Sequence, residues 1–239
     1  HTALRYRRGG GAPGIAASMP TYLNYGYTCD NHGNILCVNL NSMRPVWVYR
    51  LGDDIDGTPA LAVEDGKPYI YVGCEVDKQG IGTANFAKID GLTGRQVWIN
   101  RIEAERVEED GKHFDGGYYC SPLLGTGDCE GLVFANCVLN TSGRNGIFVA
   151  MDRATGRTVY TTDLKYYSWS SPVGLANADG TLFVFTGDCA GRAYIIRGAT
   201  GEILLTKQIG YNFESSPVVI GNSLVIGSRG DKIFKLTIK

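Results

Sequence analysis

Two stretches decide the fold: AKIDGLTGRQVW at residues 87–98 and VAMDRATGRTVY at residues 149–160. Each consists of an apolar strand, a turn with an aspartate and a Thr-Gly pair, and a second strand that ends in an aromatic residue. An aspartate can accept hydrogen bonds from turn amides, and glycine readily adopts the positive φ that such hairpins need. The motif therefore predicts structural turns built by Asp90, Asp152, Gly94, Gly156 and Gly201.

The motif belongs to a repeat. Weaker copies occur at residues 36–47 and 194–205. A second element, Ser or Thr followed by Pro before a short apolar run, recurs at Thr58-Pro59, Ser121-Pro122, Ser171-Pro172 and Ser216-Pro217, with Met19-Pro20 as a degenerate fifth copy. Another apolar run lies between each Pro element and its turn, so a unit contains four strands in up-and-down order. Units of about 40 to 50 residues with four short strands are typical of β-propeller blades.

The predicted fold class is therefore all-β, a β-propeller of four-stranded antiparallel blades with about four to five blades in this chain. The predicted segments are a lead-in or linker at 1–18, blades at 19–52, 56–104, 117–165 and 168–210, and an incomplete last blade at 214–239. Thr237 stands where the earlier units have the turn aspartate, so the last blade lacks its outer strand. We expect a C-terminal portion of a ring of about six to eight blades, completed by N-terminal blades of the same protein.

The D-x-x-T-G-x-x-x-W/Y hairpins and the preceding S-S-P-V strands resemble the quinoprotein-like (PQQ-binding-like) β-propeller repeat family over residues 19–239. Within that family the chain is most similar to extracytoplasmic propellers, which implies a secreted protein or one anchored at the cell surface through its N-terminal part. The dehydrogenases of the family carry an adjacent Cys-Cys pair, a calcium site and a catalytic aspartate. No adjacent Cys pair occurs here and no catalytic residue of the family maps onto a matching motif.

Composition excludes several classes of protein. Of 239 residues 44% are hydrophobic, which is enough for a large core and rules out intrinsic disorder. The 23 Lys and Arg balance 24 Asp and Glu, so we expect no nucleic-acid partner. The longest apolar runs have about five residues, far short of the roughly 20 of a membrane helix, so no transmembrane segment is predicted. Seven cysteines leave at least one thiol free in a monomer, and we expect Cys37, Cys74 and Cys137 to be buried.

The connections predict a functional face. The Thr-Gly turns are short, whereas the long connections Glu75–Asn85, Val138–Gly146 and Glu103–Gly117 all emerge on the other side of the blades. We call that side the long-loop face. Binding residues gather on loops carried by a rigid scaffold, so this face is the candidate binding surface, although solvated loops without a ligand would give the same pattern.

Aromatic and acidic residues cluster in the connections that lead into the innermost strands. Such a mixture suits a sugar, a peptide or a cationic ligand, because rings accept apolar surfaces or cations while carboxylates accept protons. Four of these residues stand three positions before a blade proline, so they could instead pack blade against blade. The candidate ligand-binding residues are Asp56, His113, Asp115, Tyr118, Tyr119, Tyr166, Tyr167, Trp169, Tyr211, Phe213 and Glu214.

No metal site is predicted. The acidic run Glu103–Asp110 lacks the spacing of a calcium loop and is better interpreted as solvated charge. Asn140-Thr-Ser142 matches a glycosylation sequon, which is a weak signal.

Three functions are compatible with these observations. The first is a non-catalytic extracytoplasmic scaffold that binds a protein, a small molecule or a glycan on the long-loop face, with no cofactor. The second is a quinoprotein dehydrogenase that uses PQQ with calcium and draws its remaining site residues from other blades. The third is a carbohydrate-binding or sugar-sensing propeller.

Overall fold

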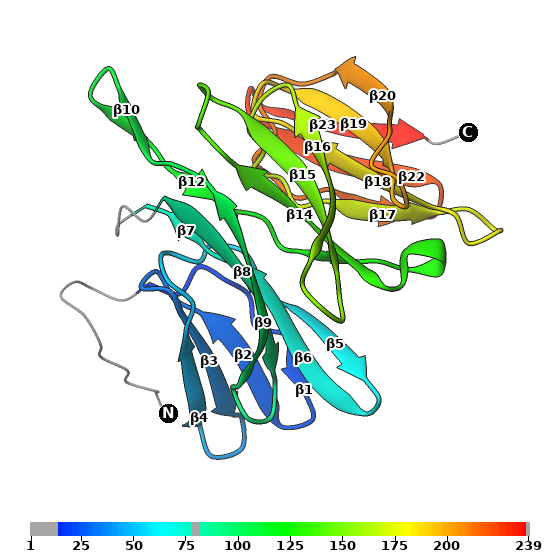
Figure 1. Cartoon of the computed structure of the whole chain (residues 1–239). Coiled ribbons are helices and arrows are strands. Elements are labelled where there is room, and N and C mark those ends of the chain that lie inside the picture. The colour runs from blue at the N-terminus through cyan, green and yellow to red at the C-terminus, as the bar shows by residue number, and fades with distance from the viewer. Residues whose placement is uncertain (1–13, 78–81, 238–239) are drawn as a thin grey trace.

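The structure is a computed structural model that describes residues 14–77 and 82–237, so most of the predicted lead-in, residues 1–13, lies outside the described residues. Strands in successive antiparallel sheets make up the fold (Figure 1). The described part of the chain has one helical element, the short 3-10 turn η1 (Gly127–Cys129). The predicted all-β class is confirmed.

The sheets follow the chain in sequence. The first contains β1 (Thr21–Tyr22), β2 (Tyr25–Cys29), β3 (Asn34–Asn39) and β4 (Arg44–Arg50) in that order. The second contains β5 (Ala60–Glu64), β6 (Lys67–Gly73), β8 (Thr83–Asp90) and β9 (Gln96–Glu103). The third contains β13 (Leu123–Leu124), β14 (Leu132–Val138), β15 (Gly146–Asp152) and β16 (Thr158–Leu164), extended beside β14 by β12 (Gly116–Gly117) and β7 (Glu75–Val76).

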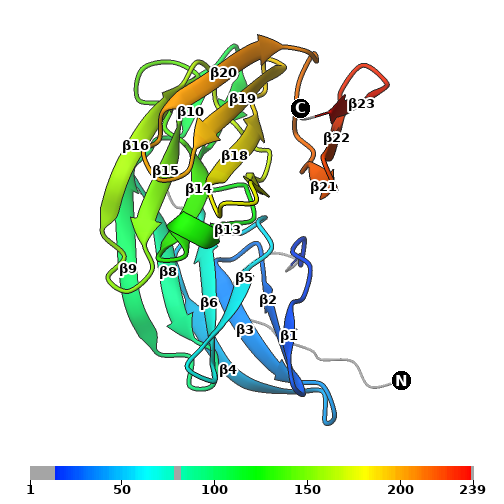
Figure 2. The same ribbon diagram turned by 90° about the vertical axis from the view of Figure 1, so that its right-hand side faces the viewer.

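The last two sheets differ in strand number. The fourth contains β17 (Val173–Ala176), β18 (Leu182–Gly187), β19 (Arg192–Arg197) and β20 (Ile203–Gln208), whereas β21 (Val218–Ile220), β22 (Ser223–Ser228) and β23 (Lys232–Thr237) form a three-stranded sheet. A separate hairpin pairs β10 (Val107–Glu109) with β11 (Lys112–Phe114). In Figure 2 the sheets succeed one another along a curve, with β1, β5 and β21 inside and β4, β9 and β16 outside. The arrangement is that of propeller blades.

The Thr-Gly turns have the predicted chemistry. Oδ1 of Asp90 accepts the backbone N–H groups of Leu92 and Thr93, both at 2.9 Å. Oδ1 of Asp152 likewise accepts the N–H of Thr155 at 2.7 Å. The glycines that follow, Gly94, Gly156 and Gly201, have φ of 71°, 74° and 77°.

These turns also join consecutive sheets. Trp47 of the first sheet donates its Nε1–H to Gly91 O of the second at 2.9 Å, and Trp98 of the second donates to Arg153 O of the third at 3.0 Å. Tyr160 of the third sheet repeats the contact with Gly198 O at 2.5 Å. An aromatic residue in the outer strand of one blade therefore forms a hydrogen bond with the turn of the next blade.

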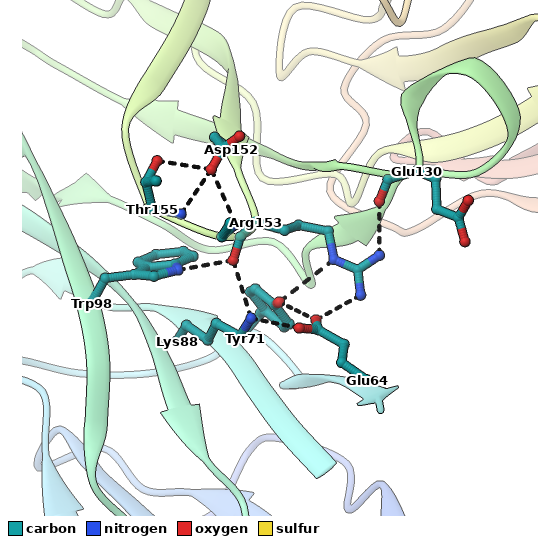
Figure 3. A network of polar contacts seen from close by, with 9 residues as sticks. Glu64, Tyr71, Lys88, Trp98, Glu130, Asp152, Arg153 and Thr155 are labelled. Carbon is teal, nitrogen blue, oxygen red and sulfur yellow. Dashed lines mark hydrogen bonds and ion pairs between the residues drawn. The ribbon is translucent and has the colours of Figure 1, made fainter. Parts of the chain in front are cut away.

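A polar network reinforces the junction between the second and third sheets (Figure 3). Glu64 of β5 pairs with Lys88 Nζ at 2.6 Å and with Arg153 of the third sheet at 2.8 Å. Lys88 is only 4% exposed and also donates to Arg153 O at 3.1 Å. Tyr71 donates to Glu64 at 2.5 Å. One carboxylate thus holds a buried ammonium and links two blades.

This network makes stability depend on acid pH. Partial burial raises the pKa of Glu64, but hydrogen bonds from Lys88, Tyr71 and Arg153 outweigh burial and hold that pKa below its usual range. A carboxyl with a lowered pKa contributes stability that is complete above its unfolded pKa and is lost as pH falls through its folded pKa. We expect the difference in free energy of unfolding between the parent and Glu64→Gln to shrink below about pH 4, where the Glu64 carboxyl of the unfolded chain becomes protonated, and to vanish as the pH falls through the lower pKa of the folded state. Urea unfolding of both proteins from pH 7 to pH 3 measures this; a constant difference would contradict it.

The core lies between neighbouring sheets. Residues of the second and third sheets form one buried cluster that includes Phe86, Trp98 and Val149. All seven cysteines are buried and none is in a disulfide, so Cys37, Cys74 and Cys137 are core residues as predicted. The described residues include no helix with the length and hydropathy needed to cross a membrane.

Candidate functional site

The three long connections meet at one place. Strand β7 begins the connection Glu75–Asn85 and pairs with β12, which lies at the end of the connection Glu103–Gly117. Strand β12 also pairs with Val138 of β14, where the connection Val138–Gly146 begins. The β10–β11 hairpin projects from the same region (Figure 1). An ion pair of 2.8 Å joins Arg144 to Glu109 of this hairpin, and the Arg144 guanidinium lies 3.7 Å from the Phe114 ring centre. The long-loop face is therefore one continuous structure.

A glycine allows this meeting. Gly117 has φ of 95°, and a Cβ at this position would lie 2.6 Å from Glu75 Cα. Only glycine permits so close an approach at positive φ. The Glu75 amide also donates to Asp54 O at 2.8 Å. These backbone contacts hold Glu75, which is 4% exposed, at the base of the site.

A cavity of about 320 Å³ opens at this junction. Its walls combine aromatic and acidic side chains with one amide, and they come from connections of the second, third and fourth sheets. The lining residues are Asp56, Glu75, His113, Phe114, Asp115, Tyr119, Val138, Asn140, Tyr167 and Trp169.

The aromatic wall is contiguous. Tyr119 stacks on Trp169 with ring centres 5.0 Å apart and an interplanar angle of 26°. The Tyr167 ring is tilted against the Trp169 ring, with ring centres 5.7 Å apart. Tyr166 lies 4.7 Å from Tyr167 and accepts a hydrogen bond from Arg144 at 3.3 Å. Three rings therefore form a wall, and Tyr166 supports it from behind.

The acidic wall is crowded. One carboxylate oxygen from each of Asp54, Asp56 and Glu75 lies within 4.8 Å of the others. Burial, together with the charges of Asp56 and Asp54, raises the pKa of Glu75 to about 9, against a hydrogen bond from Tyr119 that lowers it. Glu75 is consequently protonated at neutral pH unless a cation offsets the surrounding negative charge.

One arginine beside the cavity is already paired with acidic groups. Arg106 pairs with Asp115 at 3.1 Å and with Asp77 at 3.6 Å, and it donates to Asp77 O at 2.9 Å. Burial and the neighbouring Asp77 raise the pKa of Asp115, whereas Arg106 lowers it. The described cavity lining contains three acidic residues, Asp56, Glu75 and Asp115, and no lysine or arginine.

Six of the predicted site residues line the cavity, and five do not. Tyr118 and Phe213 are fully buried in the core, where they pack against Gly73 and Gly187, and neither belongs to the cavity lining. Tyr211, which is 77% exposed, Tyr166 and Glu214 also lie outside the lining. Glu214 instead forms an ion pair of 2.7 Å with Arg229. The six are Asp56, His113, Asp115, Tyr119, Tyr167 and Trp169.

Four lining residues were not among the predicted ones: Glu75, Phe114, Val138 and Asn140. Glu75 directly follows a buried strand run, and only its long-range pairing with β12 brings it to the site. Asn140 is the asparagine of the sequon. It is 3% exposed, and its Nδ2 donates to Phe114 O at 3.0 Å and Glu105 O at 3.2 Å, so the amide that a glycan would need is occupied.

The cavity does not suit pyrroloquinoline quinone. That cofactor carries several carboxylates, which need cationic partners. Here the lining presents Asp56, Glu75 and Asp115 instead.

Comparison with known proteins agrees with this architecture. Residues 144–239 match the family model described as outer membrane protein assembly factor BamB. No curated protein sequence matches the chain. BamB from Moraxella catarrhalis is 12% identical, with a TM-score of 0.54 over 93% of this chain and 61% of that chain.

Other propellers are equally similar in fold. Quinohemoprotein alcohol dehydrogenase from Comamonas testosteroni is 13% identical, with a TM-score of 0.61 over 94% of this chain and 41% of that chain. The β-propeller domain of Cps50 (Swd1) from Myceliophteria thermophila is 14% identical, with a TM-score of 0.59 over 94% of this chain and 65% of that chain. This chain thus spans less than two thirds of the length of each of these proteins.

The chain has a β-propeller fold, and the resemblance to quinoprotein-like propellers that the repeat predicts is confirmed. At these identities the solved structures establish a shared fold alone. The total number of blades stays a prediction.

Proposed function

We propose that this chain is part of a non-catalytic, extracytoplasmic β-propeller that binds a ligand or protein partner on its long-loop face. One observation carries the proposal: the three long connections converge on a cavity with an aromatic wall and an acidic wall. The opposite turns are short and their carbonyl groups are used in blade packing. The match to an outer membrane protein assembly factor supports the extracytoplasmic location.

Two other functions share this site. A sugar-binding propeller would use the same rings, since C–H surfaces of sugars stack on aromatic faces. A quinone-dependent dehydrogenase would need cationic groups from other blades, and the acidic lining disfavours it. A glycan array tests the first, and uptake of pyrroloquinoline quinone with calcium by the full-length protein tests the second.

Removing the Trp169 or the Tyr167 ring from the aromatic wall is expected to weaken binding at least about fivefold, because a stacked ring contributes on the order of 1 kcal/mol or more. Trp169→Ala removes the ring that stacks on Tyr119 at 5.0 Å, and Tyr167→Ala removes the ring that is tilted against Trp169 at 5.7 Å. Titration calorimetry with blocked amino-acid amides, spermidine and the best glycan of the array measures the effect.

The control is Leu92→Ala, which removes a side chain that is 45% exposed in a short turn. It should bind like the parent. Unchanged affinity of the folded Trp169→Ala and Tyr167→Ala variants, or lost binding in Leu92→Ala, would refute the proposed face.

A further inference from the structure

The cavity contains buried hydrogen-bond acceptors without donors. Glu75 Oε1 and Asn140 Oδ1 have no hydrogen-bond partner among the described residues, and their residues are 4% and 3% exposed. Both residues line the cavity. A buried acceptor without a hydrogen-bond donor lowers the stability of the folded state, and such acceptors are rare in native proteins. A ligand that brings N–H donors would satisfy both.

The orientation of Asn140 is fixed by its neighbours. Its amide nitrogen donates to two backbone carbonyls, Phe114 O at 3.0 Å and Glu105 O at 3.2 Å. An amide oxygen cannot donate, so the side chain cannot be flipped without losing both bonds. Its oxygen is therefore held as an acceptor.

Charge adds to this demand for donors. Asp54, Asp56 and Glu75 present three carboxylates within 4.8 Å. Like charges at this separation repel, so Glu75 keeps its proton at neutral pH unless a cation between the groups relieves the repulsion. Arg106, the base beside the cavity, already pairs with Asp115 and Asp77. A cationic ligand would meet the carboxyl groups of Asp56 and Glu75, which line the cavity.

The aromatic wall distinguishes an organic cation from a metal ion. Tyr119, Tyr167 and Trp169 supply π faces, which attract ammonium and guanidinium groups. A calcium ion would take six to eight oxygen ligands and make no use of the rings. The volume of about 320 Å³ also far exceeds a bare ion, whereas an alkyl chain with a cationic head fits it.

We propose that this cavity binds an alkylammonium or alkylguanidinium group, with Asp56, Glu75 and Asn140 accepting its N–H donors and Trp169 and Tyr167 covering its alkyl chain. The inference rests on the proposed function and specifies its ligand class. A free polyamine and an Arg or Lys side chain of a protein partner carry the same group.

The probes are Nα-acetyl-arginine methylamide, spermidine, neutral Nα-acetyl-norleucine methylamide and CaCl₂, each titrated at constant ionic strength. The readouts are calorimetry and Trp169 fluorescence. We expect the arginine amide or spermidine to bind at least tenfold more tightly than the norleucine amide. Preference for the arginine amide indicates a protein side chain, and preference for spermidine indicates a free polyamine. Absence of binding by both cations, equal binding of the neutral amide, or binding of CaCl₂ alone would overturn the inference.

Charge variants localise the effect. Asp56→Asn and Glu75→Gln should each weaken binding of the preferred cation at least tenfold. Glu214→Gln is the matched control, because Glu214 occupies the repeat position of Asp56 but pairs with Arg229 outside the cavity. Thermal unfolding verifies that each variant is folded. Equal affinity of the folded Asp56→Asn and Glu75→Gln variants and the parent would refute the assigned residues.

Proton release provides an independent readout. Burial and the charges of Asp56 and Asp54 raise the pKa of Glu75 to about 9, so a bound cation must displace its proton at pH 7. Affinity for the arginine amide, whose own charge is constant, should rise between pH 7 and pH 9 in the parent and stay flat in Glu75→Gln. The other titratable groups around the cavity are Asp53, Asp54, Asp56, Asp77, Asp115, Arg106, His113 and Tyr119.

The two proposals fail separately. If only a glycan binds, and Trp169→Ala weakens it, the ligand class is wrong and the binding face stands. If cations bind equally to the parent and to the Trp169, Asp56 and Glu75 variants, both proposals fail.

Discussion

Glu64→Gln is expected to lower the free energy of unfolding by about 3 kcal/mol at pH 7, because it leaves a buried ammonium without its counter-ion. Lys88 is 4% exposed, and Glu64 lies 2.6 Å from its Nζ. Breaking a buried pair by removing one partner costs about 3 to 5 kcal/mol, and the 28% exposure of the Glu64 side chain favours the lower end. Urea unfolding followed by circular dichroism measures the change.

A double variant separates the cause. Replacing both partners, Glu64→Leu with Lys88→Met, removes the unpaired charge, and such replacements are often close to neutral. We expect the double variant to be more stable than Glu64→Gln, although Arg153 then keeps only Tyr71 and Glu130 O as partners. A double variant no more stable than Glu64→Gln would show that the carboxylate acts by some means other than neutralising Lys88.

The fold was predictable because its signals are local. Each hairpin turn is specified within about five residues by its aspartate and glycine, and the same turn recurs along the chain. Asp152 and Gly156 illustrate this: the hydrogen bonds of the one and the positive φ of the other follow from residue type. The network of Glu64, Lys88 and Arg153 was not predictable, because it joins residues 24 and 89 positions apart.

The site was predictable only as far as the repeat reaches. Asp56, Tyr119 and Trp169 share the position three residues before a blade proline and meet in one cavity. The residue just before them points the other way, because successive side chains of an extended segment alternate. Tyr118 therefore enters the core while Tyr119 lines the cavity, which the clustering of aromatics in the sequence did not distinguish.

The turn glycines carry the second large expected effect. Gly156→Ala should destabilise the chain by about 2 to 5 kcal/mol, the sum of about 1 to 2 for positive φ and about 1 to 3 for overpacking. Gly156 has φ of 74°, and a Cβ there would lie 2.5 Å from the ring of Trp98. The ring cannot withdraw without weakening its bond to Arg153 O, which joins the second and third sheets.

Gly66→Ala is the matched control, because Gly66 also lies in a hairpin turn, has φ of 75°, and a Cβ added there would have no atom within 4 Å. Its variant should therefore lose only the conformational part, about 1 to 2 kcal/mol. The excess of Gly156→Ala over Gly66→Ala in urea unfolding measures the steric part. When both proteins carry Trp98→Leu, adding Gly156→Ala should cost no more than Gly66→Ala, since the clashing ring is gone. Equal losses in the two single glycine variants would mean that contact with Trp98 does not require glycine.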